Sequence, residues 1–138
     1  MDMLESAGFF TPVVVHYTNG TIVKCHATGT EMGPTHVLVN SNDGTSYKIR
    51  NRDLKAVFFV KTLIGDDEYN ESRKFPEGFH TTGQKIGVRF KDGERIVGVS
   101  HDFDPKKPGF NLVPADGKSN NLKIYVLRSS LHDLVLLH

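Results

Sequence analysis

The sequence predicts an all-β protein made of two tandem five-stranded small barrels packed together. Short segments of apolar residues, several alternating with polar ones, are separated by Gly, Asn, Asp and Pro turn signals, which is typical of strands. The pattern of five strands occurs twice, and such a repeat decides the fold. We expect a first barrel over residues 10–63, a connector over 64–83 and a second barrel over 84–138.

The composition is that of a protein with a packed core. The 138 residues are 38% hydrophobic before the 13 glycines are counted, which is close to the usual share in globular proteins. Either barrel alone, at about 55 residues, would bury too little surface to be stable. We therefore expect the two barrels to pack on each other.

A tight hairpin opens each copy of the pattern. Apolar strands flank Asn19-Gly20 and Asp92-Gly93, and both dipeptides favour hairpins because they accept a positive φ. In the second copy, the alternation predicts a two-residue turn that sets Val88 opposite Val97. In the first copy it predicts a three-residue loop with a left-handed Gly20, which sets Val15 opposite Val23.

Three more strands follow in each copy. They are expected at residues 35–39, 47–49 and 54–60, and again at 109–113, 124–126 and 131–137. The connector between the copies is long for a structureless loop. Its aromatic residues Tyr69, Phe75 and Phe79 are expected to pin it across the two barrels.

Part of the repeat resembles Sm-like proteins, which are SH3-like barrels. A turn glycine, a later glycine, an aspartate and an Asn-Leu-Val strand recur in the first Sm signature. Similar residues here are Gly93, Gly98, Asp102 and 111–113. Residues 49–54 resemble the second signature with Asn51 at its glycine position, and residues 127–131 depart further. The resemblance implies SH3-like/Sm-like barrels and, as an alternative function, RNA binding.

More of the chain resembles a bacterial family of unknown function whose members occur alone or beside PilZ and other signalling domains. The segments that carry this likeness are 54–61, 91–94, 109–116 and 120–126. The resemblance implies an architecture and a bacterial signalling context but no chemistry. The paired arginines and the Asp/Asn-x-Ser-x-x-Gly motif of a PilZ nucleotide site do not occur.

No pattern of catalytic or metal-binding residues stands out. The 7 histidines include no His-x-His or His-x-x-x-His pair, whereas a metal site needs three or four converging ligands. Cys25 and His26 are adjacent in a strand, so their side chains point to opposite faces and Cys25 is expected in the core. We expect no enzyme activity, no cofactor and no metal.

The chain is expected to be cytoplasmic. No apolar run approaches the roughly 20 residues of a membrane span. Residues 1–5 lack the basic start of a signal peptide, and the 1 cysteine excludes an internal disulfide framework.

Positive charge gathers in the second copy. The chain has a net charge of +1, with −2 over residues 1–69 (6 basic, 8 acidic) and +3 over 70–138 (11 basic, 8 acidic). An ordinary solvated surface explains so small a charge, and an RNA-binding patch is the alternative. The candidate binding residues are Arg73, Lys74, Arg89, Arg95, Phe103, Lys106 and Lys107.

Protein binding is the function that the sequence favours. SH3-like barrels offer a groove and edge strands to a partner. Adjacent strand residues face opposite ways, so one of Phe58 and Phe59 points out of its own barrel, as does part of the run 134–137. These strands either pack barrel against barrel or form a surface for a homodimer or another partner. We expect a non-enzymatic binding or regulatory module in bacterial signalling; a ligand site between the barrels is a third hypothesis.

Overall fold

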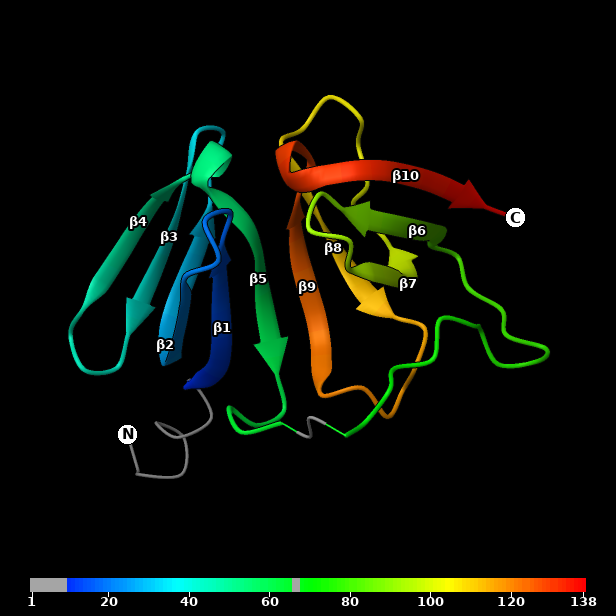
Figure 1. Cartoon of the computed structure of the whole chain (residues 1–138), viewed down its shortest axis with the longest axis horizontal. Helices are drawn as coiled ribbons and strands as arrows, with labels where there is room; N and C mark the ends of the chain where they lie inside the picture. Colours follow the sequence, from blue (N-terminus) through cyan, green and yellow to red (C-terminus); the bar gives the residue numbers. More distant parts are fainter. Residues whose placement is uncertain (1–9, 66–67) are drawn as a thin grey trace.

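A computed structural model describes residues 10–65 and 68–138. In these residues, ten antiparallel strands form one sheet in the order β10-β6-β7-β8-β9-β5-β1-β2-β3-β4 (Figure 1). The first five are β1 (Thr11–Tyr17), β2 (Ile22–Met32), β3 (His36–Ser41), β4 (Ser46–Arg50) and β5 (Leu54–Val60). The others are β6 (Gln84–Phe90), β7 (Arg95–Ser100), β8 (Gly109–Pro114), β9 (Asn121–Leu127) and β10 (Leu131–Leu137). Short 3-10 turns, η1 (Asn51–Asp53) and η2 (Arg128–Ser130), precede β5 and β10. The prediction of an all-β protein is confirmed.

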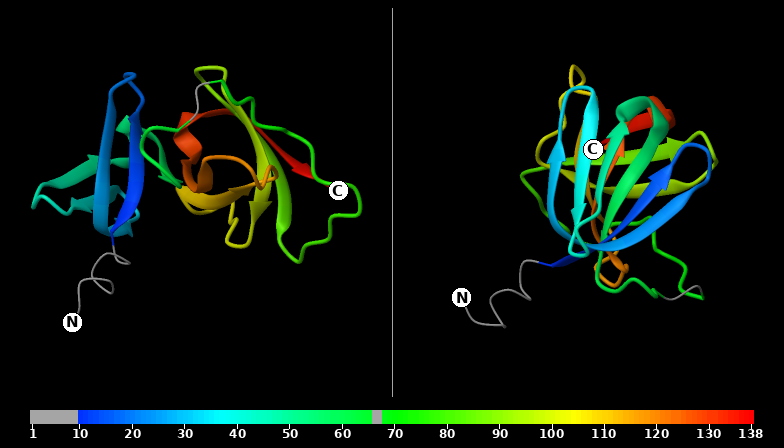
Figure 2. Two further views of the ribbon diagram at one scale, coloured as in Figure 1. Left: turned by 90° about the horizontal axis from the view of Figure 1, so that it is seen from below. Right: turned by 90° about the vertical axis from the view of Figure 1, so that its left-hand side faces the viewer.

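The two halves of the sheet have the same strand order. Strands β5-β1-β2-β3-β4 of the first half correspond to β10-β6-β7-β8-β9 of the second. Both halves also carry a β-bulge at the same place, next to Leu54 on β5 and Leu131 on β10. The halves lie side by side and are joined by pairing of β5 with β9, so the sheet is continuous and open (Figure 2).

The two opening hairpins have the same loop length. The predicted first register is confirmed, with Val15 opposite Val23 and Gly20 at a φ of 91°. The prediction for the second hairpin is wrong, because Val88 lies opposite Ile96 rather than Val97. Gly93 has a φ of 96° and closes a three-residue loop there too.

A glycine explains why the alternation of apolar and polar residues predicted the wrong register for the second hairpin. Gly98 lies opposite Ile86, where the predicted register put Val99. A Cβ on Gly98 would lie 2.2 Å from the carbonyl oxygen of Val113 on β8. This inward position therefore has no room for a side chain. It holds glycine instead of an apolar residue, so the apolar alternation in the sequence does not show that the position faces the core.

Two hydrophobic cores lie on opposite faces of the sheet. On β5, Val57 and Phe59 belong to the first core, whereas Ala56, Phe58 and Val60 belong to the second. All seven residues of β5 are buried. The prediction that β5 is buried on both faces is confirmed, since it lies between β1 and β9 in the centre of the sheet.

The same prediction is wrong for residues 134–137. They lie on β10, which is an edge strand paired only with β6. Val135 is 54% exposed and Leu136 is 44% exposed. No strand of the described chain pairs with the outer edge of β10.

The connector packs on the second half of the sheet (Figure 1). Phe75 and Phe79 stack on each other at 5.1 Å, and the Lys85 ammonium of β6 lies 4.9 Å from the Phe75 ring. The Tyr69 hydroxyl donates a hydrogen bond to Asp116, in the loop between β8 and β9. The three aromatic residues thus hold the connector to the second half, rather than across both halves as the sequence predicted.

Candidate functional site

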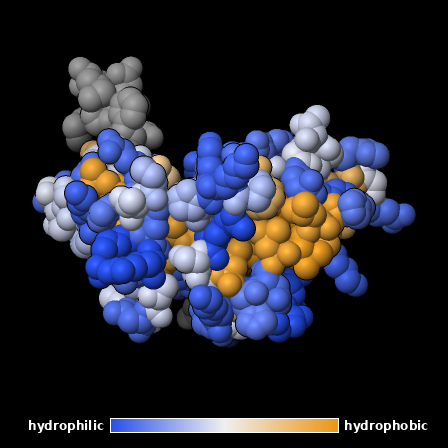
Figure 3. Space-filling model, turned by 90° about the horizontal axis from the view of Figure 1, so that it is seen from above, coloured by the Kyte–Doolittle hydropathy of each residue, from blue (hydrophilic) through white to orange (hydrophobic). Residues whose placement is uncertain are grey.

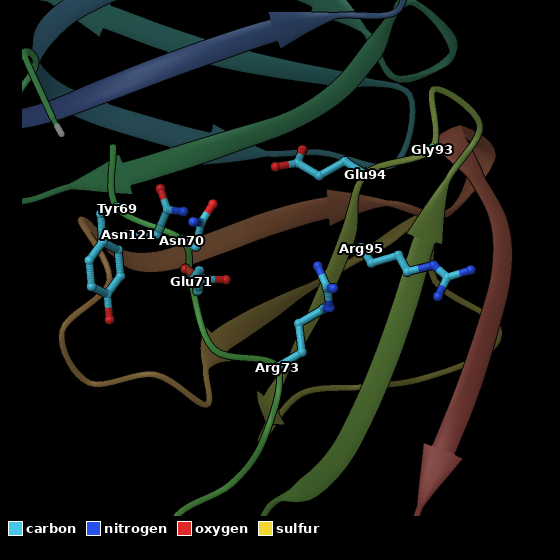
Figure 4. Close-up of a pocket in the computed structure, with 8 residues that line it drawn as sticks. All are labelled: Tyr69, Asn70, Glu71, Arg73, Gly93, Glu94, Arg95 and Asn121. Carbon is cyan, nitrogen blue, oxygen red and sulfur yellow. The ribbon is translucent and has the colours of Figure 1, made fainter. Parts of the chain in front are cut away.

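The connector, the β6–β7 turn and β9 enclose a pocket of about 700 Å³, here called the connector pocket (Figure 4). Its lining consists of residues 69–71, Arg73, residues 93–95 and Asn121. Most of these side chains are polar or charged. The pocket therefore suits a polar group of a ligand rather than an apolar one.

Hydrogen bonds to the β8–β9 loop fix the connector wall of this pocket. The Asp116 carboxylate accepts from the Tyr69 hydroxyl and from the Ser72 amide at 2.9 Å. The bond to Asp116 raises the pKa of Tyr69 to about 12. Glu71 accepts a hydrogen bond from the Ser119 hydroxyl, and burial raises the pKa of its carboxyl.

An apolar groove of about 500 Å³ lies on the outer face of β6, β7 and β10. Figure 3 shows a continuous apolar patch over the second half of the molecule. Groove residues on β6 and β7 are Gly87, Val88 and Val97, and those on β10 are Val135 and Leu137. Arginines 73, 89 and 95 and Asp133 complete its lining.

Arg73 and Arg95 line both the connector pocket and the apolar groove. Figure 4 shows the Arg73 side chain directed toward Arg95. Within residues 10–65 and 68–138, no ion pair joins either guanidinium to an acid. The third arginine, Arg89, is already paired with Asp133 at 2.6 Å. Arg73 and Arg95 are therefore the two groove arginines that have charge to offer a ligand.

The structure divides the basic patch that the sequence predicted. Arg73, Arg89 and Arg95 come together at the groove, with Lys74 exposed on the connector beside Arg73. Lys106 and Lys107 lie on the β7–β8 loop, outside both the groove and the connector pocket. Phe103 is half-buried and packs edge-on against the buried Phe110 at 5.1 Å, so part of its ring is covered.

Phe58 and Phe59, the predicted interface residues, lie inside the chain. They are 5% and 7% exposed and belong to different cores. The alternative in which the strand packs one half of the chain on the other fits their position. Neither ring is available to an external partner.

A family model covers every residue that the structure describes. It matches residues 10–138. The chain belongs to DUF6982, a family of unknown function. No curated protein and no solved structure matches the chain.

In this DUF6982 chain, sequence reasoning missed a buried lysine at the junction of the halves. Lys55 on β5 is 8% exposed, and its ammonium lies 2.6 Å from both Asp92 Oδ2 and Glu94 Oε1. It also lies 4.7 Å from the centre of the Phe90 ring. The available signal was a lysine within the otherwise apolar run 54–60.

Lys55 also changes the electrostatics of its surroundings. It neutralises Glu94 at the edge of the connector pocket. Burial and the Lys55 charge lower the pKa of His16, whose ring packs 4.7 Å from that of Phe58. The junction is thus held by an ion pair network beside aromatic rings.

Other chemistry-bearing residues are dispersed. Among the described residues, no three His, Cys, Asp or Glu side chains are placed to hold a metal ion. Cys25 is buried, and burial raises the pKa of its thiol, which disfavours the reactive thiolate.

No helix in the described part of the chain is long and apolar enough to cross a membrane.

Proposed function

We propose that this chain is a non-enzymatic protein-binding module that takes a partner segment on the outer face of β6, β7 and β10. The observation that carries the proposal is the position of Arg73 and Arg95. They lack an acidic partner in the described chain and stand between an apolar groove and a polar pocket.

This arrangement selects for a particular kind of segment. Apolar side chains of the partner would cover Val97, Val135 and Leu137, and each Å² removed from water contributes about 25 cal/mol. A neighbouring carboxylate would accept the paired donors of an arginine, which match its geometry. The expected ligand is therefore an extended segment in which an acidic residue adjoins an apolar one.

The same proposal includes the architecture of each half and the cellular process in which the chain acts. Each half is proposed to be an SH3-like/Sm-like small barrel unit, so that the chain is a tandem repeat. The repeated strand order, the shared bulge and the shared loop support this reading. We place the module in the bacterial cytoplasm as part of signalling, on the resemblance stated above.

Capture from a lysate of the native host tests the binding site. The tagged wild-type chain is compared with Arg73→Glu/Arg95→Glu and with Lys106→Glu/Lys107→Glu, which makes the same charge change outside the groove. We expect a defined protein partner that the wild type and the lysine variant retain and the arginine variant loses. Nuclease should not release it.

Two outcomes would contradict the proposal. One is capture of the same proteins by the arginine variant as by the wild type. The other is nuclease-sensitive recovery of RNA that the lysine variant loses, which would instead support the RNA-binding alternative.

A further inference from the structure

Two adjacent apolar residues are exposed on the edge strand β10. Val135 is 54% exposed and Leu136 is 44% exposed. Successive strand residues point to opposite faces of a sheet, so a partner lying on one face would cover only one of them. A strand added along the edge would cover both and would also pair backbone groups of β10 that no described strand pairs.

The chain contains an internal precedent for such an added strand. By the shared bulge and register, Val135 and Leu136 on β10 correspond to Phe58 and Phe59 on β5. Strand β9 pairs with the other edge of β5, opposite β1, and the two phenylalanines are 5% and 7% exposed. This edge of the equivalent strand is thus built to accept an antiparallel neighbour.

The two free edges of the sheet differ in chemistry. The edge strand β4 exposes Ser46, Lys48 and Arg50, and charged side chains of this kind protect an edge against pairing. Residues 134–137 of β10 carry no charge. If β4 of one chain paired with β10 of another in the register of the β5–β9 junction, Lys48 of β4 would lie beside Leu134. If β10 of one chain paired with β10 of another, apolar residues would lie against apolar residues.

We propose that two copies of the chain associate through β10, paired antiparallel across a two-fold axis. The two ten-stranded sheets then form one continuous sheet. A two-fold contact closes after two copies, as the commonest oligomers do. Because Val135 also lines the apolar groove, the dimer brings the grooves of both copies together and presents two arginine pairs to one bivalent partner.

The dimer shares Val135 with the groove of the proposed binding site, but the two proposals depend on different residues, Leu136 on the edge of β10 here and Arg73 and Arg95 there. Sedimentation and light scattering over a wide concentration range should give twice the chain mass of 15.4 kDa. Leu136→Lys places a charge in the contact and should weaken dimerisation at least about tenfold. Leu122→Lys is the matched control, since Leu122 is 50% exposed on β9 away from the edge.

Cross-linking identifies the strand that β10 meets. Val135→Cys chains treated with a short bismaleimide should link to each other, whereas Cys25 is buried and serves as the unreactive background. A mixture of Ser46→Cys and Leu136→Cys chains that forms mixed dimers would overturn the proposal in favour of β4–β10 pairing. A monomer at every concentration, or a dimer unchanged by Leu136→Lys, would also overturn it. Arg73→Glu/Arg95→Glu should remain dimeric, which keeps this test separate from that of partner binding.

Discussion

Among the described residues, Lys55 forms the ion pairs that join the two halves. It belongs to the first half by sequence, yet its ion pairs are with Asp92 and Glu94 of the second. Burying a cation is unfavourable unless it is paired. The two carboxylates and the Phe90 ring provide that compensation, and they thereby fix the turn that borders the connector pocket.

Replacing Lys55 with Met should lower the free energy of unfolding by roughly 1–2 kcal/mol. The apolar stem is kept and the ion pairs are lost, and the two acids are half-exposed, which limits the cost. Urea unfolding measures the change, with Lys48→Met on the exposed β4 edge as the control. Equal stability of Lys55→Met and wild type would show that the network contributes nothing.

The same variant makes a prediction about pH. Burial opposes ionisation of Asp92, but the hydrogen bond from Lys55 and other contacts outweigh it and lower the pKa of that carboxyl. A lowered pKa stabilises the fold above the ordinary value, and the effect is lost as the pH falls through the folded-state value. The stability difference between wild type and Lys55→Met should therefore hold at neutral pH and shrink below about pH 4. A difference that grows in acid would contradict this role.

Tyr69 fastens the connector through a single hydroxyl. Its hydrogen bond is the largest influence lowering the pKa of Asp116. In Tyr69→Phe, the Asp116 pKa should rise toward its ordinary value, which an NMR pH titration of the carboxyl measures. Asp102, whose pKa is lowered by contacts with Asn111 and Ser100 against its own burial, is the internal control and should not move. An unchanged Asp116 pKa would show that the hydroxyl does not hold the connector.

At the scale of single elements, β7 shows how close approach of strands sets a register. Gly98 allows β8 to pass so near that a Cβ would lie 2.2 Å from a backbone oxygen. In contrast, a Cβ on Gly29 of β2 would meet nothing within 4 Å. The two glycines lie in the same kind of element but differ in what surrounds them.

Gly98→Ala should therefore destabilise the fold by roughly 1–3 kcal/mol, because backbone must shift to admit the methyl group. Gly29→Ala should stay within about 0.5 kcal/mol of wild type. Thermal and urea unfolding of the pair provide the comparison. Equal effects of the two substitutions would contradict the close approach of β7 and β8.

Strands β5 and β10 show what sequence can and cannot predict here. Both carry consecutive apolar residues, and the pattern predicted burial on both faces for each. It was right for β5, where β9 arrives as a neighbour, and wrong for β10, where no described strand does. Local pattern gives the strand, but its neighbours depend on pairing between residues far apart in the chain.

The same limit applies to the candidate site. Composition located the basic residues in the second half, and three of the arginines do meet at one groove. Lys106 and Lys107 do not join them, because both lie in the β7–β8 loop, which does not line the groove. The connector pocket was not predictable, since its walls depend on hydrogen bonds such as that of Tyr69 across 47 residues of sequence.

At the scale of the whole molecule, the two halves share their cores. The first core includes Tyr125 and Leu127 of the second half, and the second core includes Val14 and Phe58 of the first. Neither half can keep its core intact if the other unfolds. The chain should therefore unfold as one cooperative unit, although its strand order repeats.

Native-state hydrogen exchange on Val37→Ala tests this cooperativity most directly. Val37 is fully buried in the first core on β3 and belongs to a strand that does not pair with the second half. The substitution should lower the opening free energy of the slowest amides in β3 by roughly 1–3 kcal/mol. The slowest amides of β6 and β7 should lose the same amount. If β6 and β7 keep their wild-type protection while the first half loses its own, the two halves are independent domains and the shared-core description is wrong.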